Sequence, residues 1–256
     1  MMRPITSSRG CALRVSLPEV RPFATGHFAF PDWEIVGSEL DTHGCSVQAG
    51  LLSPQECRTV CELYDAEENF RSRIVMARHG FGSGEYKYFT YPLPPLIADL
   101  RTALYSPLAA IANRWSGALR MDTSYPVAHQ AFLDRCHGAG QKLATPLLLK
   151  YGQGGYNCLH QDIYGEHIFP LQAAVLLSHP EKDFSGGEFT LAEQRPRMQS
   201  RAEVVPLQQG DGVVFPVRHR PVKGTRGVYR VAMRHGVSRI RSGSRCTLGI
   251  IFNDAI

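Results

Sequence analysis

The second half of the chain consists of short apolar runs separated by turn residues, and this pattern restricts the fold more than any other feature. Eight such runs follow one another: TPLLLKY, YNCLHQD, PLQAAVLLS, GEFTLAE, AEVVPL, DGVVFPV, YRVAMRHGVS and RCTLGIIF. Short apolar segments punctuated by Gly, Pro and Asp are typical of the strands of a sandwich or barrel. Eight is also the strand number of a jelly roll. The sequence therefore predicts a jelly-roll core over residues 143–256.

Helix signals dominate the first half of the chain. Asp32 is placed to cap a helix, and Ser53-Pro54-Gln55-Glu56 is a capping box with proline at the first helical position. These caps and the apolar periodicity that follows them predict four helices, over residues 33–40, 54–67, 96–115 and 126–137.

These two halves predict a mostly β protein with a helical N-terminal layer. We expect residues 31–142 to support the β core, so that residues 31–256 form a single domain. Residues 1–30 carry arginines but no continuous apolar segment, which predicts a flexible tail and not a secretory signal. No run approaches the roughly 18 to 20 apolar residues of a membrane span, so we expect no membrane partner.

The cysteines and the charge distribution bear on the cellular compartment and on the kind of ligand. Seven cysteines are scattered without a C-x-x-C pair, which fits reduced thiols in a cytoplasmic protein better than a disulfide framework or a zinc site. The net charge is +5, yet residues 212–253 hold nine basic residues and no acidic one. Such a basic stretch fits an anionic ligand, either polyanionic or small, and it also fits a solvated basic face.

One small set of residues has the spacing of a metal site. On a strand, His160 and Asp162 point to the same side and can present an imidazole and a carboxylate to one ion. His235 follows 73 residues after Asp162, and Arg245 lies ten residues beyond His235. Two imidazoles and one carboxylate can occupy one face of an octahedral metal and leave three positions open, an arrangement that suits non-haem Fe(II) oxygenases. Alone, a His-x-Asp pair is more often a surface or capping feature.

With its context, this set resembles the Fe(II)/2-oxoglutarate-dependent dioxygenase superfamily, which folds as a double-stranded β-helix. Its members show His-x-Asp on one jelly-roll strand and the pattern H-x-V-x-x-V/I-x-x-G-x-R on two later ones, and HGVSRIRSGSR fills every position of that pattern. The resemblance implies iron held by His160, Asp162 and His235. It also implies 2-oxoglutarate held by Arg245, Thr247 and Tyr151, because a planar guanidinium binds a carboxylate with two parallel hydrogen bonds.

His219 is an alternative second histidine, since it follows GDGVVFPV at a spacing also seen before distal ligands. Only His235 is followed both by an arginine ten residues later and by a clean strand over residues 246–252. We therefore expect His235 to be the ligand. The sequence does not name the residues that orient the ligands.

The resemblance also implies a reaction. O₂ and 2-oxoglutarate would be consumed, succinate and CO₂ released, and a hydroxyl placed on the substrate, with ascorbate as the reductant in vitro. Hydroxylation of an N-methyl carbon would release formaldehyde, which amounts to demethylation.

A closer resemblance extends over residues 32–255. The phrases VMARHGFGSGEYKYF, YNCLHQDIYGEHIFPLQ, EQRPRMQSR and RHGVSRIRSGSR are similar to a bacterial group of these oxygenases that is linked to damaged nucleic acids. Members of that group end in I-I-F-H-D-A, whereas this chain has Asn253, so we expect no direct catalytic role for that position.

Residues 71–91 mix cations with aromatic rings, a combination that can hold single-stranded nucleic acid by phosphate pairing and base stacking. This stretch could form a lid over the active site, or an amphipathic edge hairpin packed on the barrel. It supplies four candidate substrate contacts: Arg73, Arg78, Lys87 and Tyr88.

Several functions stay open at this point. An oxygenase of this kind could act on an alkylated base in single-stranded or damaged nucleic acid, on a prolyl or other protein side chain, or on a small metabolite. A cupin-like metal-binding protein without enzymatic activity could share the β architecture, but it would not need Arg245 at its spacing from His235.

Overall fold

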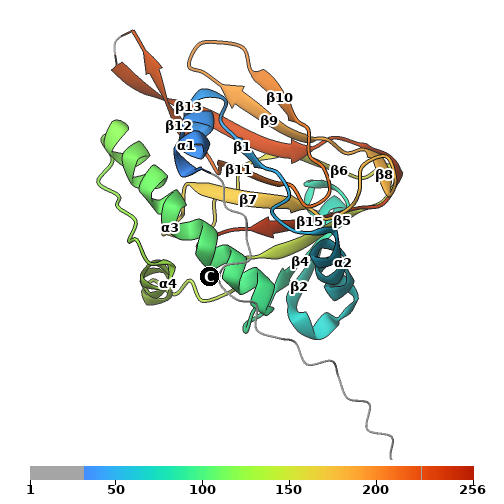
Figure 1. Cartoon of the computed structure of the whole chain (residues 1–256). Helices are drawn as coiled ribbons and strands as arrows, with labels where there is room; N and C mark the ends of the chain where they lie inside the picture. The colour runs from blue at the N-terminus through green and yellow to red at the C-terminus, as the bar shows by residue number, and fades with distance from the viewer. Residues whose placement is uncertain (1–31, 226) are drawn as a thin grey trace, which may run out of the picture.

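The computed structural model describes residues 32–225 and 227–256, which form two facing β-sheets with helices against one of them (Figure 1). The predicted tail over residues 1–30 and Arg226 of the basic stretch lie outside the described residues. From edge to edge, the large sheet runs β1 (Ser46–Gln48), β11 (Gly212–Pro216), β7 (Leu171–Leu176), β15 (Arg245–Ile250), β5 (Leu147–Tyr151), β4 (Glu85–Phe89) and β2 (Phe70–Val75).

The small sheet faces the large one and is also antiparallel. It runs β10 (Arg201–Val205), β9 (Phe189–Gln194), β13 (Gly227–Val237), β6 (Tyr156–His160) and β3 (Gly82–Ser83), with β12 (His219–Gly224) paired to β13. A separate two-stranded sheet joins β14 (Ile240–Gly243) to β8 (Phe184–Gly186). All eight predicted runs contain a strand, and the mostly β fold is confirmed.

Four α-helices form in the first half of the chain, as predicted: α1 (Trp33–Thr42), α2 (Pro54–Glu62), α3 (Pro95–Ala118) and α4 (His129–Gly138). Asp32 caps α1 by accepting a hydrogen bond of 2.9 Å from the Glu34 amide. The Ser53 and Glu56 capping box is present at the start of α2. No helix among the described residues is long and apolar enough to cross a membrane.

The second helix is shorter than predicted. It ends at Glu62 and not near residue 67, and two 3₁₀ turns follow, over Leu63–Asp65 and Glu67–Asn69. Ala66 separates these turns with an extended backbone. The early end turns the Tyr64 carbonyl toward the buried Lys87, whose Nζ donates to it over 2.8 Å. The shorter helix thus leaves the Tyr64 carbonyl paired with a buried ammonium.

The large sheet buries side chains on both of its faces. On β7, Ala173 and Val175 belong to the core shared with α3, whereas Ala174 and Leu176 belong to the core between the sheets. Figure 1 shows α3 lying along the large sheet, with α4 near the C-terminus. The helices therefore close the outer face of the large sheet and leave its inner face to the small sheet and to the site described below.

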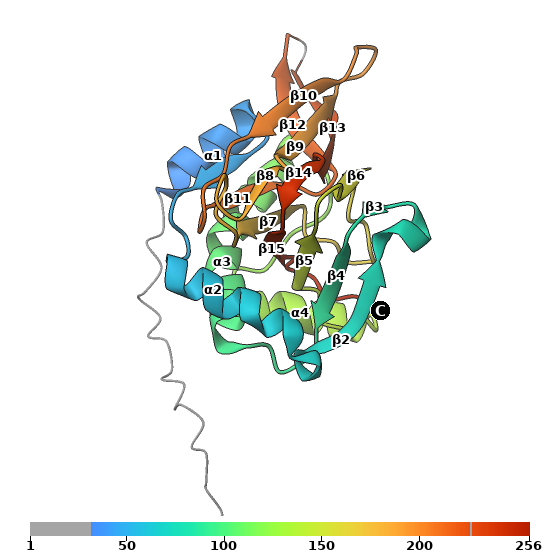
Figure 2. The ribbon, with the colours of Figure 1, turned by 90° about the vertical axis from the view of Figure 1, so that its right-hand side faces the viewer.

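Residues 70–89 form strands at the edge of the large sheet. In β4, Tyr86 lies opposite Leu149 and Tyr88 lies opposite Leu147, so β4 continues the sheet beyond β5. Figure 2 shows β3 and β4 running beside β6 and β5, which places this segment at both sheets. The edge-hairpin interpretation of this stretch matches these pairings better than a lid does.

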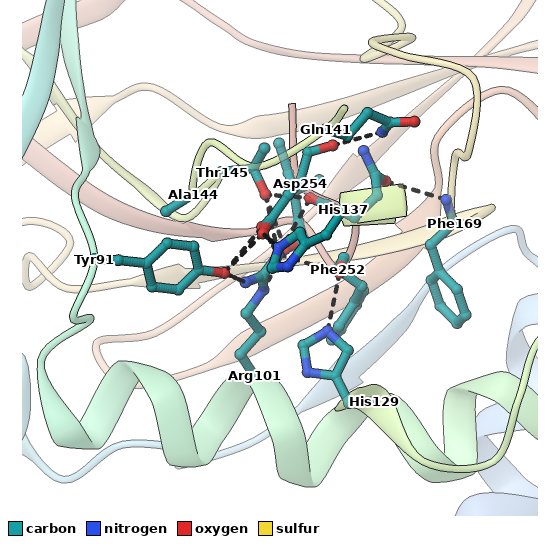
Figure 3. Close-up of polar contacts among 12 residues, drawn as sticks. Tyr91, Arg101, His129, His137, Gln141, Ala144, Thr145, Phe169, Phe252 and Asp254 are labelled. Carbon is teal, nitrogen blue, oxygen red and sulfur yellow. Dashed lines mark hydrogen bonds and ion pairs between the residues drawn. The ribbon is translucent and has the colours of Figure 1, made fainter. Parts of the chain in front are cut away.

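A buried polar network fixes the C-terminal end of the chain (Figure 3). The Asp254 side chain is fully buried and accepts hydrogen bonds from Arg101 Nη2 over 2.9 Å and from the Tyr91 hydroxyl over 2.9 Å. His137 Nε2 lies 2.8 Å from Oδ2 of Asp254. Arg101 also donates to the carbonyl oxygens of residues 251, 252 and 253. The network ties α3 and α4 to the end of β15.

Asn253 belongs to this structural region. Its Oδ1 accepts a hydrogen bond of 3.1 Å from the Phe169 amide. The side chain is buried, 3% exposed, and makes no contribution to the walls of the cavity described below. This placement agrees with the expectation that Asn253 has no direct catalytic role.

Candidate metal centre

Three predicted ligands meet between β6 and β13. These strands are antiparallel neighbours, and His160 at the end of β6 lies directly opposite His235 on β13. Asp162 follows two residues after His160, where the chain has left the strand. One ligand atom from each of the three side chains lies within 4.8 Å of the other two. Strand register therefore brings together residues that are far apart in the sequence.

The three side chains point at one another. Nε2 of His160 lies 3.4 Å from Oδ1 of Asp162, and Nε2 of His235 lies 3.3 Å from Oδ2. The two imidazole centres are 4.1 Å apart. Nδ1 of His160 lies 2.7 Å from the Cys158 carbonyl oxygen, which can only accept, so Nδ1 carries the proton. This hydrogen bond leaves the lone pair of Nε2 directed at the shared space.

Burial and hydrogen bonding set the charges of the triad. Burial alone would raise the pKa of Asp162, but the neighbouring His160 and His235 side chains outweigh it and hold the pKa well below its usual range. Burial lowers the pKa of His235. Burial also acts to lower the pKa of His160, but the Asp162 carboxylate outweighs it and the pKa is raised. An ionised carboxylate beside two imidazoles is the donor set that binds a divalent transition metal.

His219, the alternative ligand, lies elsewhere. It begins β12 and pairs with Ala232, three residues before His235. It is not among the side chains that converge on Asp162. The geometry therefore favours His235 over His219.

Gln172 is a member of this group that the sequence analysis did not identify. It projects from β7, is 3% exposed, and its Nε2 donates to Oδ2 of Asp162 over 3.0 Å. The same nitrogen lies 3.2 Å from Nε2 of His235. Because the carboxylate can only accept, Gln172 presents its amide nitrogen and holds Asp162 in place. A lone amide in the apolar run PLQAAVLLS was the available signal.

A cavity of about 320 Å³ opens onto the triad. Its walls come from the inner face of the large sheet, from β6 and β13, and from the segment before β3. Its polar and aromatic lining residues include Tyr86, Tyr88, Tyr151, His160, Asp162, Tyr164, Gln172, His235, Arg245 and Thr247.

The three residues predicted at the co-substrate come together at one end of this cavity. Arg245 on β15 lies opposite Tyr151 on β5, and its guanidinium carbon is 5.9 Å from the centre of the Tyr151 ring. Its Nη1 donates to the Thr247 hydroxyl over 2.5 Å. Tyr151 and Thr247 are themselves buried.

Arg245 is a buried cation that the described chain does not neutralise. It is 1% exposed, its Nε has no hydrogen-bond partner among the described residues, and it forms no ion pair with any of them. Burial lowers its pKa. Because an uncompensated buried charge is costly, this position suits an anionic ligand.

The four candidate substrate contacts fall on different sides of the sheet. Side chains alternate along β4, so that Tyr88 lines the cavity and Lys87 faces away from it. Lys87 is 3% exposed, and its Nζ donates to the Glu67 carboxylate over 2.6 Å. The Lys87 ammonium is therefore already engaged outside the cavity.

Arg73 and Arg78 lie outside the cavity as well. Arg73 is opposite Lys87 in the β2–β4 pairing and forms an ion pair with Glu85 on the same outer side. Its charge is therefore directed away from the cavity. Arg78 is exposed on the 3₁₀ turn Met76–His79, two residues before Gly80, which lines the cavity.

The basic stretch over residues 212–253 does not form a single surface. Arg245 is buried at the cavity, and Arg220 is buried against the Glu193 carboxylate. At least these two charges are unavailable to a polyanion on the surface. The number of basic residues in this stretch therefore overstates the positive charge that a polyanion could contact.

Comparison with known proteins agrees with this geometry. A model of the Oxygenase-NA family, described as an oxygenase catalysing oxidative methylation of damaged DNA, matches residues 84–255. Two uncharacterised proteins of Mycobacterium tuberculosis, from strains CDC 1551 and H37Rv, are each 49% identical over 167 residues. Each match covers 65% of this chain and 72% of the relative.

Solved structures share the fold at low identity. The epimerase SnoN from nogalamycin biosynthesis, described as non-haem and α-ketoglutarate-dependent, has a TM-score of 0.54 and 15% identity, over 86% of this chain and 81% of SnoN. A prolyl hydroxylase of Trichoplax adhaerens, solved with a hypoxia inducible factor peptide, has a TM-score of 0.51 and 14% identity, over 86% of this chain and 87% of the hydroxylase. The predicted jelly-roll fold is thus confirmed.

Proposed function

The chain belongs to the Oxygenase-NA family of oxygenases, and on that premise we propose that it oxidises an alkylated base in single-stranded or damaged nucleic acid, using Fe(II), 2-oxoglutarate and O₂. The observation that carries the cofactor assignment is the pairing of a converged His-Asp-His set with a buried, uncompensated arginine in one cavity. A site for metal alone would not need that arginine.

The triad fits Fe(II). His160, Asp162 and His235 would hold the metal on one face, because their donor atoms already converge and the carboxylate is ionised. Gln172 would keep one oxygen of Asp162 engaged, which leaves the other oxygen for the metal. Bound Fe(II) would supply the activation of O₂ that this class of oxidation requires.

Arg245 fits the far carboxylate of 2-oxoglutarate. Its planar guanidinium is fixed by the Thr247 hydroxyl and flanked by the Tyr151 ring, so little side-chain freedom remains to be lost on binding. The dicarboxylate would neutralise the charge that the chain leaves unpaired.

The substrate proposal rests on the family description, which concerns damaged DNA. A hydroxyl placed on an N-methyl carbon makes an unstable adduct that releases formaldehyde and returns the N–H of the base. A base inside a duplex cannot reach an enclosed cavity, so the substrate would be unpaired or extruded from its stack.

The test is product formation from a single-stranded oligonucleotide with one N-methylated base, in the presence of Fe(II), 2-oxoglutarate and ascorbate. We expect succinate and formaldehyde in equal amounts, and neither product with His235→Ala. His219→Ala is the matched control and should keep the activity. Succinate without formaldehyde, together with hydroxylation of a prolyl peptide or a small metabolite, would move the proposal to those substrates.

We also propose a cytoplasmic location. The six cysteines in the described part of the chain are free, which fits a reducing compartment. Fractionation of cells that express the tagged chain would test this.

A further inference from the structure

Uncharged aromatic side chains form one wall of the cavity beside the metal centre. Tyr86 and Tyr88 project from β4 to the same side, with ring centres 5.4 Å apart in an edge arrangement. The Tyr164 hydroxyl lies 3.4 Å from Oδ1 of Asp162. Tyrosine side chains carry no charge near pH 7, so this wall presents a neutral aromatic surface that suits a flat ring.

This wall lies away from the arginine at the co-substrate end. Arg245 is opposite Tyr151 on β5, whereas Tyr88 is opposite Leu147. Tyr151 and Leu147 are four residues apart on one strand, which corresponds to roughly 13 Å. A dicarboxylate held by Arg245 is shorter than that span, so the Tyr88 end stays open to a second molecule.

Arg71 adds a positive charge at this open end. It sits at an irregularity in the β2–β4 pairing, and its guanidinium carbon lies 4.6 Å from the centre of the Tyr88 ring. Its Nε donates to the Ala144 carbonyl over 2.9 Å, which fixes the side chain in place. Arg71 has no ion-pair partner in the part of the chain that the structure describes, and it is only partly buried.

We infer that the Tyr88 end of the cavity is a nucleotide subsite, in which an unpaired base lies against the tyrosines and Arg71 contacts the adjoining phosphate. Every base offers a flat face for stacking on an aromatic side chain. The two terminal nitrogens of a guanidinium match the geometry of a phosphate. The inference rests on the proposed function, because it assigns residues to the substrate of that same oxygenase site.

A neighbouring arginine provides a matched control. Arg73 lies on the same strand as Arg71, two residues away, but it pairs with Glu85 on the side that faces away from the cavity. Both variants remove one positive charge from β2. Only the Arg71 variant removes a charge at the Tyr88 end of the cavity.

The experiment measures binding of a fluorescently labelled, single-stranded DNA with one N-methylated base to the full chain, loaded with Fe(II) and 2-oxoglutarate without O₂. Arg71→Gln should weaken binding about tenfold or more and reduce the slope of log affinity against log salt by about 0.7. Arg73→Gln should bind within about twofold of the unchanged protein.

A second pair of variants tests the ring. Tyr88→Phe keeps the aromatic face and should bind nearly as well as the unchanged protein. Tyr88→Leu removes the face and should weaken binding on the order of tenfold. The Phe variant also shows whether a change at this position disturbs the fold.

Succinate formation from 2-oxoglutarate, with and without the methylated DNA, is measured in every variant and separates the two proposals. Equal weakening by Arg71→Gln and Arg73→Gln, or no binding by the unchanged protein even at low salt, would overturn the subsite. No succinate from the unchanged protein, with DNA binding that still depends on Arg71, would reject the oxygenase proposal and retain the subsite.

Discussion

Two of the groups of buried polar side chains in this fold differ in whether the described chain supplies all of their hydrogen-bond partners. Around Asp254, both carboxylate oxygens accept hydrogen bonds from Arg101, Tyr91 or His137. Around Asp162, two members of the cavity retain buried polar atoms without a hydrogen-bond partner among the described residues, namely Nδ1 of His235 and Oε1 of Gln172. At the far end of the same cavity, Nε of Arg245 is also unpaired.

This difference indicates that the group around Asp254 is a structural network and that the group around Asp162 and Arg245 is a ligand-binding site. A closed network stabilises the fold, since each buried charge has its counter-charge inside the chain. A buried polar atom without a hydrogen-bond partner costs free energy unless a ligand supplies that partner. Native structures rarely keep such atoms without a function. The contrast predicts that changes near Asp254 alter stability, whereas changes near Asp162 and Arg245 alter ligand binding.

The largest expected effect is on stability, at Asp254. Asp254→Ala would leave the buried Arg101 guanidinium without its carboxylate, and breaking such a pair typically lowers the free energy of unfolding by about 3 to 5 kcal/mol. Urea denaturation would measure the loss. Asp134→Ala, on the exposed side of α4, is the control and should change stability by less than about 0.5 kcal/mol. A loss below 1 kcal/mol at Asp254 would show that this network does not stabilise the fold.

The next effect is a pH dependence at His129, which lies beside the same network (Figure 3). Burial, followed by the charge of Arg101, lowers the pKa of His129 from its ordinary 6.5 to about 4. Between these values the unfolded chain binds a proton that the folded chain does not bind. Stability therefore falls as the pH drops from 6.5 to 4, by about 3 kcal/mol from this residue.

Denaturation curves across that pH range would test this dependence. His129→Gln keeps a hydrogen-bond donor for the Phe252 carbonyl but cannot titrate, so its stability should fall less steeply between pH 6.5 and 4. Parallel pH profiles for the variant and the unchanged protein would contradict the assignment.

Sequence alone predicted the parts of this molecule that depend on local patterns. Apolar runs and turn residues gave the strands, and the spacing of His160, Asp162 and His235 gave the candidate ligands. The fixed alternation of a strand makes such reasoning reliable. Which face of the sheet Lys87 occupies was not predictable in this way, because the face that each residue of a strand takes depends on how the strand pairs with its neighbours.

The missed residues depend on contacts between distant segments. Gln172 reaches Asp162 from another sheet, and Arg71 contacts Tyr88 at an irregularity in the β2–β4 pairing. Asp254 meets Arg101 across most of the chain length. Strand register and β-bulges determine which distant side chains come into contact, and a single sequence does not specify them.

The His235→Ala variant should lose most of its iron affinity and keep its fold. His235→Ala removes one of three ligands, and we expect iron affinity to fall by at least about 100-fold, more than the loss of an outer hydrogen bond would cause. Stability should change little in comparison with Asp254→Ala, because the lost imidazole already has an unpaired nitrogen. Iron titration and urea denaturation of both proteins measure the two quantities. His219→Ala should bind iron normally, and the reverse result would transfer the ligand role to His219.

The smallest of these effects concerns the co-substrate. Arg245→Lys keeps the positive charge but loses the planar fork, so one charge-assisted hydrogen bond to the carboxylate is lost, which corresponds to about 1.5 to 3 kcal/mol. We therefore expect the affinity for 2-oxoglutarate to fall about tenfold or more while iron affinity is unchanged. Titration with 2-oxoglutarate, followed by succinate formation, measures both binding and use of the co-substrate. Arg241→Lys, at an exposed position on β14, is the matched control and should behave as the unchanged protein does. If Arg245→Lys binds 2-oxoglutarate as well as that control, the Arg245 guanidinium does not bind this dicarboxylate. The unpaired nitrogen of Arg245 would then not mark a co-substrate site, in contrast to what the comparison with the Asp254 network predicts.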